Sequence, residues 1–123
     1  MAHAQSQPNP AAPMAPAAFH ILLSVADGER HGYAIMQEVA ALTRGAMRLG
    51  PGTLYTNIKR LAGNGLLEET EERPDPEQDD ERRRYYRLTD EGRRVLGAES
   101  QRLETLVEIA RRKKLLPHRS TIG

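Results

Sequence analysis

The residues from Leu49 to Leu61 read LGPGTLYTNIKRL, and this stretch decides the fold. A turn is expected at Pro51-Gly52, with a short helix starting at Thr53. Behind that start, apolar residues recur at i, i+4 and i+7, which places them in one stripe along the helix. The stripe predicts the side that docks on the core, and it consists of Leu54, Ile58 and Leu61.

The other sides of this predicted helix offer hydrogen-bonding groups and two cations, but no acid. A helix that docks by one stripe and presents such a face suits insertion into the major groove of DNA. An ordinary surface helix is the alternative that this stretch alone leaves open. The polar positions are Tyr55, Thr56, Asn57, Lys59 and Arg60.

Composition limits the size and the class of the protein. The chain has 123 residues, of which 38% are hydrophobic and 4% aromatic, so its core is small and would gain from association with a second copy. The absence of cysteine excludes disulfides and thiolate metal sites. The four histidines are scattered, so neither a zinc site nor a cofactor is expected. Without a membrane-spanning run or a signal peptide, a cytoplasmic location is expected.

The formal net charge of +1 conceals two oppositely charged parts. Between Glu68 and Glu81 there are nine acids and one base, Arg73. The remainder of the chain carries 17 basic and 8 acidic side chains, a net charge of +9. That excess favours a polyanionic partner.

The order of the expected elements is that of a winged helix-turn-helix. Residues 1–16 are rich in Ala and Pro and predict a disordered tail. Two helices are then expected before the polar-faced one, and two strands around a polar loop predict a wing after it. The expected DNA-binding domain is 17–88, with helices at 17–26 and 33–43, a turn-rich joint at 27–32, and strands at 66–72 and 84–88.

Two further groups are candidates for phosphate contact. Tyr33 falls in the first turn of the second helix, where a hydroxyl and open N–H groups could hold a phosphate. Its alternative role is to cover the edge of the core. The basic triplet Arg82, Arg83 and Arg84 lies where the wing returns to the body, and its alternative role is to neutralise the neighbouring acids.

A long helix is expected over 89–116, followed by a disordered tail at 117–123. Thr89, Asp90 and Glu91 are typical of a helix start, with a hydroxyl cap and acids in the first turn. So long a helix at the end of a small domain predicts pairing with a second copy, although folding back on its own domain is the alternative. The expected dimerisation residues are Leu96, Leu103, Leu106, Val107 and Ala110.

The order of these motifs resembles the PadR-like family of bacterial transcriptional regulators. The matching motifs are HGY at 31–33, PGTLY at 51–55, the steps KRL and GLL within 59–67, and RRYYRLTDEG at 83–92. The resemblance implies a mainly α winged helix-turn-helix domain with a small β-hairpin and a single C-terminal dimerisation helix. It also implies repression of transcription, often relieved by a small molecule bound near the dimer interface. It places Thr53, Tyr55 and Lys59 on the recognition helix, and Tyr33 at the start of the second helix.

The leading hypothesis is therefore a homodimeric repressor that reads a roughly palindromic operator in double-stranded DNA. Lys59 and Arg60 would contact phosphates or guanines, while Thr53, Tyr55 and Asn57 are candidates for base edges or backbone. The alternative is a winged-helix module for protein–protein interaction that uses the acidic wing loop. An enzyme is not expected, because the chain has no phosphate-cradling glycine loop and no supported nucleophile–base arrangement.

Overall fold

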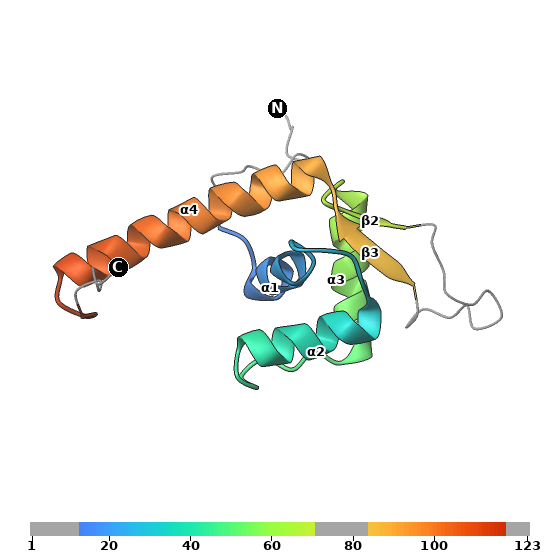
Figure 1. Ribbon diagram of the computed structural model, residues 1–123, viewed down its shortest axis with the longest axis horizontal. Coiled ribbons are helices and arrows are strands. Elements are labelled where there is room, and N and C mark those ends of the chain that lie inside the picture. Colours follow the sequence, from blue (N-terminus) through green and yellow to red (C-terminus); the bar gives the residue numbers. More distant parts are fainter. Residues whose placement is uncertain (1–12, 71–83, 118–123) are drawn as a thin grey trace, which may run out of the picture.

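The computed structural model describes residues 13–70 and 84–117, and the fold is the expected winged helix with a long C-terminal helix (Figure 1). Three helices precede the hairpin, a three-stranded antiparallel sheet has the order β1-β3-β2, and α4 runs across one side of the domain. The elements are α1 (Pro16–Ser24), β1 (Arg30–His31), α2 (Gly32–Leu42), α3 (Pro51–Gly63), β2 (Leu67–Glu69), β3 (Tyr85–Leu88) and α4 (Asp90–Arg112).

One apolar core joins all four helices and the sheet. The expected stripe of α3 is buried in it, and both residues that follow the α3 stop, Leu66 and Leu67, are buried as well. The core consists of Ile21, Leu22, Val25, Ile35, Val39, Leu54, Ile58, Leu61, Leu66, Leu67, Tyr86, Val95 and Leu96.

Helix α3 begins earlier than the sequence predicted. Gly50 is its N-cap and Pro51 occupies the first turn, so the expected Pro-Gly turn is part of the helix. Proline is well suited to that position, because its fixed φ is helical and the N–H it lacks would have no helical partner. The predicted stop at the other end is confirmed. Gly65 has φ +79°, and the Leu66 N–H donates to Leu61 O at 3.0 Å, which closes a Schellman motif.

The expected joint between the first two helices contains a strand, β1, that was not predicted. Arg30 and His31 pair with Tyr86 and Tyr85 of β3. Two residues are too short for a period-2 pattern, so only the tertiary pairing identifies β1. The expected hairpin is present, with Leu67 opposite Leu88, but its described strands are shorter than predicted. The loop 73–83 lies outside the described residues.

The predicted tail at 1–16 is wrong at its C-terminal end. Helix α1 already begins at Pro16, and the Met14 N–H donates to Glu99 Oε2 at 3.2 Å. The Ala/Pro composition of this segment did not indicate either feature. The carboxylate that Met14 contacts lies on α4, far away in the sequence. Residues 1–12 lie outside the described part of the chain.

Helix α4 packs on the domain only with its first half. Its start is capped as predicted, because the Thr89 Oγ1 accepts from the Gly92 N–H at 2.9 Å. Val95, Leu96 and Glu99 are buried, and beyond Glu99 the helix projects past α1, away from the sheet (Figure 1). It ends at Arg112, earlier than predicted, with Lys114 at φ +67°. In the described residues, no helix is both long and apolar enough to cross a membrane.

Candidate nucleic-acid interface

The outward face of α3 is a shallow hollow opposite the buried stripe. Leu54, Ile58 and Leu61 anchor the helix, so residues on its far side are turned to solvent. The structure brings together three of the predicted DNA-contacting residues there, and adds two that were not chosen. The hollow is lined by Gly52, Tyr55, Thr56, Lys59 and Arg60.

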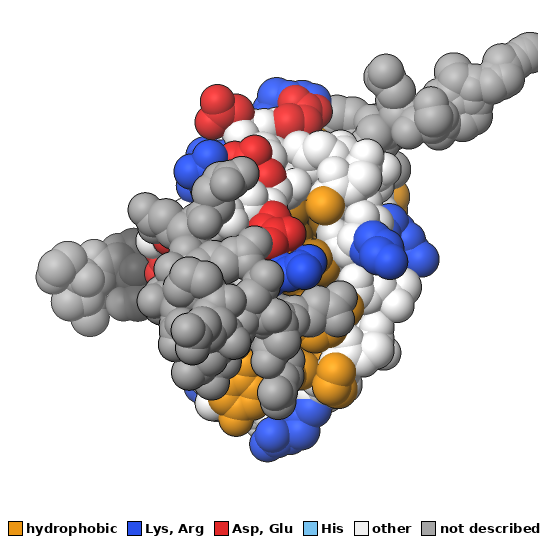
Figure 2. Space-filling model, turned by 90° about the vertical axis from the view of Figure 1, so that its right-hand side faces the viewer, with side chains coloured by type: hydrophobic (Ala, Val, Ile, Leu, Met, Phe, Trp, Pro, Cys, Tyr) orange, Lys and Arg blue, Asp and Glu red, His pale blue; other side chains and the backbone are white. Residues whose placement is uncertain are grey.

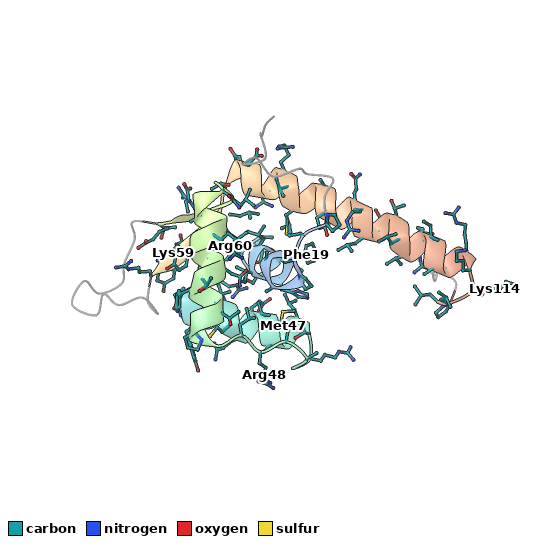
Figure 3. The ribbon with its side chains drawn as sticks, turned by 180° about the vertical axis from the view of Figure 1, so that it is seen from behind. Phe19, Met47, Arg48, Lys59, Arg60 and Lys114 are labelled. Atoms are coloured by element: carbon teal, nitrogen blue, oxygen red, sulfur yellow. The ribbon has the colours of Figure 1, made fainter. Side chains whose placement is uncertain are left out.

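The electrostatic character of this face comes from its two cations. Lys59 and Arg60 are exposed, and within residues 13–70 and 84–117 neither forms an ion pair. Their side chains stand on α3 with Arg60 toward α1 and Lys59 toward the wing (Figure 3). Since α3 contains no acid, the whole helix attracts anions.

Positive charge is not confined to α3. Figure 2 shows the side of the sheet, where visible basic side chains of the described residues lie at the top, the middle and the bottom of the face. A surface of this kind can follow a charged backbone over some distance rather than bind one small anion.

Tyr55 connects α3 to the start of α2. Its phenol lies so close to Gly32 that a Cβ at residue 32 would be 2.2 Å from the tyrosine hydroxyl. This contact requires glycine at residue 32 and joins the HGY and PGTLY motifs in space. It also leaves Tyr55 half-buried, while the residue still lines the hollow.

Thr53 and Asn57 lie beside the hollow rather than in it. Thr53 is exposed in the first turn of α3, near the open N–H groups of the helix start. The Asn57 amide donates to Thr53 O at 2.9 Å, and its side chain faces the α1 side of the helix. Thr56 was predicted to lie on the polar face but was not among the predicted DNA contacts, and Gly52 was not predicted at all, although its angular position opposite the apolar stripe could have identified it.

Tyr33 stands at the start of α2 and is 51% exposed. Its ring stacks on that of His31, with 6.5 Å between centroids, and the T-shaped pair of His31 and Tyr85 continues the cluster onto β3. His31 is held by its own capping role, because its Nδ1 accepts the Ala34 N–H at 3.1 Å. These ring contacts therefore hold the Tyr33 side chain in place while it stays half exposed to solvent.

The wing residues divide between the described and the undescribed parts of the chain. Arg82 and Arg83 lie outside the described residues. Arg84 Nε is 3.6 Å from Glu69 Oε2, so this side chain has the alternative role of neutralising an acid of the neighbouring strand. Arg87 likewise donates to Glu68 at 2.6 Å.

The predicted dimerisation residues separate into two groups. Leu96 was predicted to lie on a dimer face, but it is 5% exposed and belongs to the protomer's own core. This part of α4 is already covered by the domain, so Leu96 is removed from the predicted dimer face. Leu103 and Ala110 are half-buried, whereas Leu106 and Val107 are 50% and 41% exposed. These four continue the same helical face beyond the end of the domain.

The model of the PadR-like family of transcriptional regulators matches residues 21–98, which run from within α1 through α2, α3 and the hairpin strands into the first half of α4. The chain belongs to the PadR-like family. The curated relative "Transcriptional regulator Rv3488" of Mycobacterium tuberculosis (strain ATCC 25618 / H37Rv) is 42% identical over 87 residues, which are 71% of this chain and 75% of the relative. Membership of the PadR-like family therefore identifies the chain as a transcriptional regulator.

Solved structures of PadR-family members share the fold. A PadR family transcriptional regulator from Eggerthella lenta DSM 2243 has a TM-score of 0.60 and 28% identity, covering 84% of this chain and 83% of that one. A PadR family transcription regulator from Clostridium difficile R20291 has a TM-score of 0.62 at 23% identity, covering 77% of this chain and 94% of that one. The second likeness concerns the fold alone.

Proposed function

We propose that this PadR-like regulator binds operator DNA as a homodimer and represses transcription. The observation that carries the proposal is the outward face of α3, which is exposed, free of acids and occupied by Lys59 and Arg60. Each α3 enters a major groove, where the two cations reach phosphates or guanine edges. Thr53, Thr56 and Tyr55 supply neutral hydrogen-bonding groups at the same surface.

The N–H groups at the start of α3 support the proposed contact with the phosphate backbone of DNA. Pro51 has no N–H, and the Leu54 N–H bonds Gly50 O at 2.9 Å, so the N–H groups of Gly52 and Thr53 remain at the exposed end. The positive end of the helix dipole adds to the attraction for a phosphate. Tyr33, Arg82 and Arg83 are proposed additional phosphate contacts.

The uncovered half of α4 supports the homodimer. Its apolar face is continuous with the face that packs on the domain, yet the described protomer offers nothing to cover Leu106 and Val107. A second α4 provides a matching surface under two-fold symmetry. A two-fold dimer places the two recognition helices about one helical turn of DNA, ~34 Å, apart on a palindromic site.

The proposal is tested by titrating a labelled duplex from the region upstream of the protein's own gene, alongside a scrambled duplex of the same composition. We expect the upstream duplex to bind at least tenfold more tightly, with a complex of two protein chains per duplex. Equal binding of the two duplexes would contradict sequence-specific recognition. Absence of binding to both at low salt would favour the alternative, a protein-interaction module that uses the acidic wing loop.

A further inference from the structure

The carboxylate of Glu99 is buried, and the proposed DNA contacts do not use it. Glu99 is the last buried residue along α4, and only 3% of its side-chain surface is exposed. Its Oε2 accepts hydrogen bonds from the Met14 N–H at 3.2 Å and from Arg102 at 2.7 Å, and its Oε1 accepts a second bond from Arg102 at 2.9 Å. The carboxylate therefore joins the segment before α1 to the middle of α4.

Other hydrogen bonds hold α4 on the domain closer to the start of the helix. The Thr89 Oγ1 donates to Gly65 O at 2.6 Å, just after α3. The Arg93 guanidinium donates to Ala26 O at 3.0 Å, just after α1. Of these contacts, that of Glu99 lies farthest from the start of α4, so it has the greatest leverage over the direction of the helix.

The hydrogen bonds of Glu99 constrain α4 in a way that its apolar neighbours do not. Val95 and Leu96 bury apolar surface, and this stabilisation has no preferred direction. Hydrogen bonds, in contrast, weaken steeply when their angles change. Replacing a buried ion pair with apolar side chains of similar volume is often neutral for stability. The carboxylate at residue 99 is therefore better explained by the geometry that it fixes than by stability alone.

The direction of α4 sets the distance between the two α3 helices of the proposed dimer. At ~1.5 Å per residue, Glu99 lies roughly 15 Å and Leu106 roughly 25 Å from Thr89. With the start of α4 as the pivot, a shift of ~1 Å at Glu99 moves Leu106 by up to ~1.7 Å relative to the domain. Because both protomers contribute, the separation of the α3 helices changes by up to ~3 Å, close to the ~3.4 Å rise of one base pair.

We propose that Glu99 is a positioning residue that sets the half-site spacing which the dimer accepts in DNA. Its bonds to Met14 and Arg102 fix α4 relative to the domain that carries α3. They thereby fix the separation of the two outward faces of α3, and Glu99 acts on DNA only through α4. This role rests on the proposed function, a dimer that binds operator DNA.

The first test needs no DNA and measures the separation of the two α3 helices directly. The chain has no cysteine, so Thr56→Cys, at an exposed position of α3, carries one spin label per protomer. Pulsed electron paramagnetic resonance should give one narrow distribution of distances between the labels. Adding Glu99→Gln should make the distribution about twice as broad, because α4 then pivots at its start. An equally narrow distribution in Glu99→Gln would overturn the proposal.

The matched control is Glu91→Gln. Glu91 forms the same kind of ion pair, with Arg94 three residues later on α4, but both side chains are exposed and the pair does not reach the segment before α1. This substitution should leave the distance distribution unchanged. A distribution that broadens equally in both variants would show that the loss of a charge from α4, rather than the bond to Met14, is responsible, and would contradict the role of Glu99.

Arg102→Gln is a second variant that keeps the test decisive if Glu99→Gln fails to fold. It removes two of the three hydrogen bonds of the carboxylate and leaves the bond from the Met14 N–H. Since the Arg102 side chain is 32% exposed, the substitution opens no enclosed cavity. The distance distribution should broaden here as well, and an unchanged distribution would count against the proposal.

The second test measures the spacing preference, with the upstream duplex and with duplexes that carry one or two extra base pairs at the centre of the bound site. One base pair lengthens the site by ~3.4 Å and rotates one half by about 34°. We expect the wild type and Glu91→Gln to lose about tenfold in affinity at one insertion, and Glu99→Gln to lose less than about threefold. Unfolded chains lower the apparent affinity for every duplex alike, so a loss of stability does not change this ratio. Equal ratios in the wild type and Glu99→Gln would overturn the role in spacing.

Failure of this proposal is distinguishable from failure of the proposed function. If the wild type binds the upstream duplex while Glu99→Gln keeps the narrow distance distribution and the spacing ratio, only the role of Glu99 is wrong. If the labelled wild type is a monomer, or binds neither the upstream nor the scrambled duplex, the proposed function is wrong and the role of Glu99 fails with it.

Discussion

The phenol of Tyr55 occupies the space that a side chain at residue 32 would need, so α3 packs closely against Gly32 at the start of α2. A Cβ at residue 32 would be 2.2 Å from the hydroxyl and 2.8 Å from the Cζ of that ring. The two residues are far apart in the sequence, in the motifs HGY and PGTLY. Their contact explains why residue 32, at the start of α2, needs to be a glycine opposite the tyrosine of α3.

Gly32→Ala should therefore displace Tyr55 and weaken DNA binding. Because the new methyl group must move either the ring or the backbone, we expect a loss of about 1–3 kcal/mol in the free energy of unfolding. Gly63→Ala, in open space on α3, is the control and should be neutral or slightly stabilising. Chemical denaturation and DNA titration measure the two effects. An alanine at residue 32 that leaves both unchanged would disprove the tight contact.

Gly92→Ala should separate the start of α4 from the domain. A Cβ at this position would be 2.1 Å from Leu66 O, which is backbone and cannot rotate away. We expect the free energy of unfolding to fall by about 1–3 kcal/mol. Gly97→Ala on the same helix meets nothing within 4 Å and should raise it by about 0.5–1 kcal/mol. Equal effects of the two substitutions would mean that the close approach at Leu66 is absent.

Acid should destabilise the protein through Glu99. Its pKa is lowered from 4.5, chiefly by the hydrogen bonds from Arg102 at 2.7 and 2.9 Å, with a further bond from the Met14 N–H. A carboxyl whose pKa is lower in the folded state contributes its full stabilisation above pH 4.5, and loses it as the pH falls through the folded pKa. Glu99→Gln should lower the melting temperature at pH 7 and flatten its decline below pH 4.5.

A smaller acid-induced decline should remain in Glu99→Gln, because Arg94 also lowers the pKa of Glu91. The matched control is Glu104→Gln, at an exposed position of the same helix. Its melting temperature should follow that of the wild type at every pH. Identical pH profiles for Glu99→Gln and the wild type would show that the buried carboxylate contributes nothing to acid sensitivity.

Leu106→Lys should dissociate the proposed dimer. The substitution places a cation in the apolar face of α4 that is proposed to pair with a second copy, and we expect the dimer dissociation constant to rise tenfold or more. Thr105→Lys adds the same charge on the opposite side of the helix and should leave the dimer intact. Sedimentation equilibrium distinguishes the two. A monomeric wild type would contradict the proposed pairing at the outset.

The sequence predicted the elements whose patterns are local. The stripe of α3, the glycine stop after it and the Thr89 cap all depend on residues within one or two turns, so their spacing was sufficient. β1 is visible only through its pairing with β3, and the end of the supposed tail only through the Met14–Glu99 bond. Both depend on partners more than 50 residues away, which periodicity cannot detect.

The candidate interface was predictable for the same reason, but only in part. Lys59 and Arg60 follow from their places on a helix whose inner side is known. Asn57 is close to them in sequence but lies on the side of α3 that faces α1. Leu96 lies on the apolar face of α4 as predicted, but it is buried in the core of its own protomer. The spacing of apolar residues predicts which side of a helix is buried. How far along the helix another element covers that side depends on the tertiary structure, which spacing does not show.

The most direct test of the central claim is the salt dependence of binding to the upstream duplex by the wild type and by Lys59→Ala. If the outward face of α3 binds DNA, the affinity for the upstream duplex should fall steeply as the salt concentration rises. The Lys59→Ala variant should bind less tightly, with a logarithmic slope smaller by about 1 if that lysine contacts a phosphate. Identical affinity and slope for the two proteins would contradict the placement of this face of α3 against DNA.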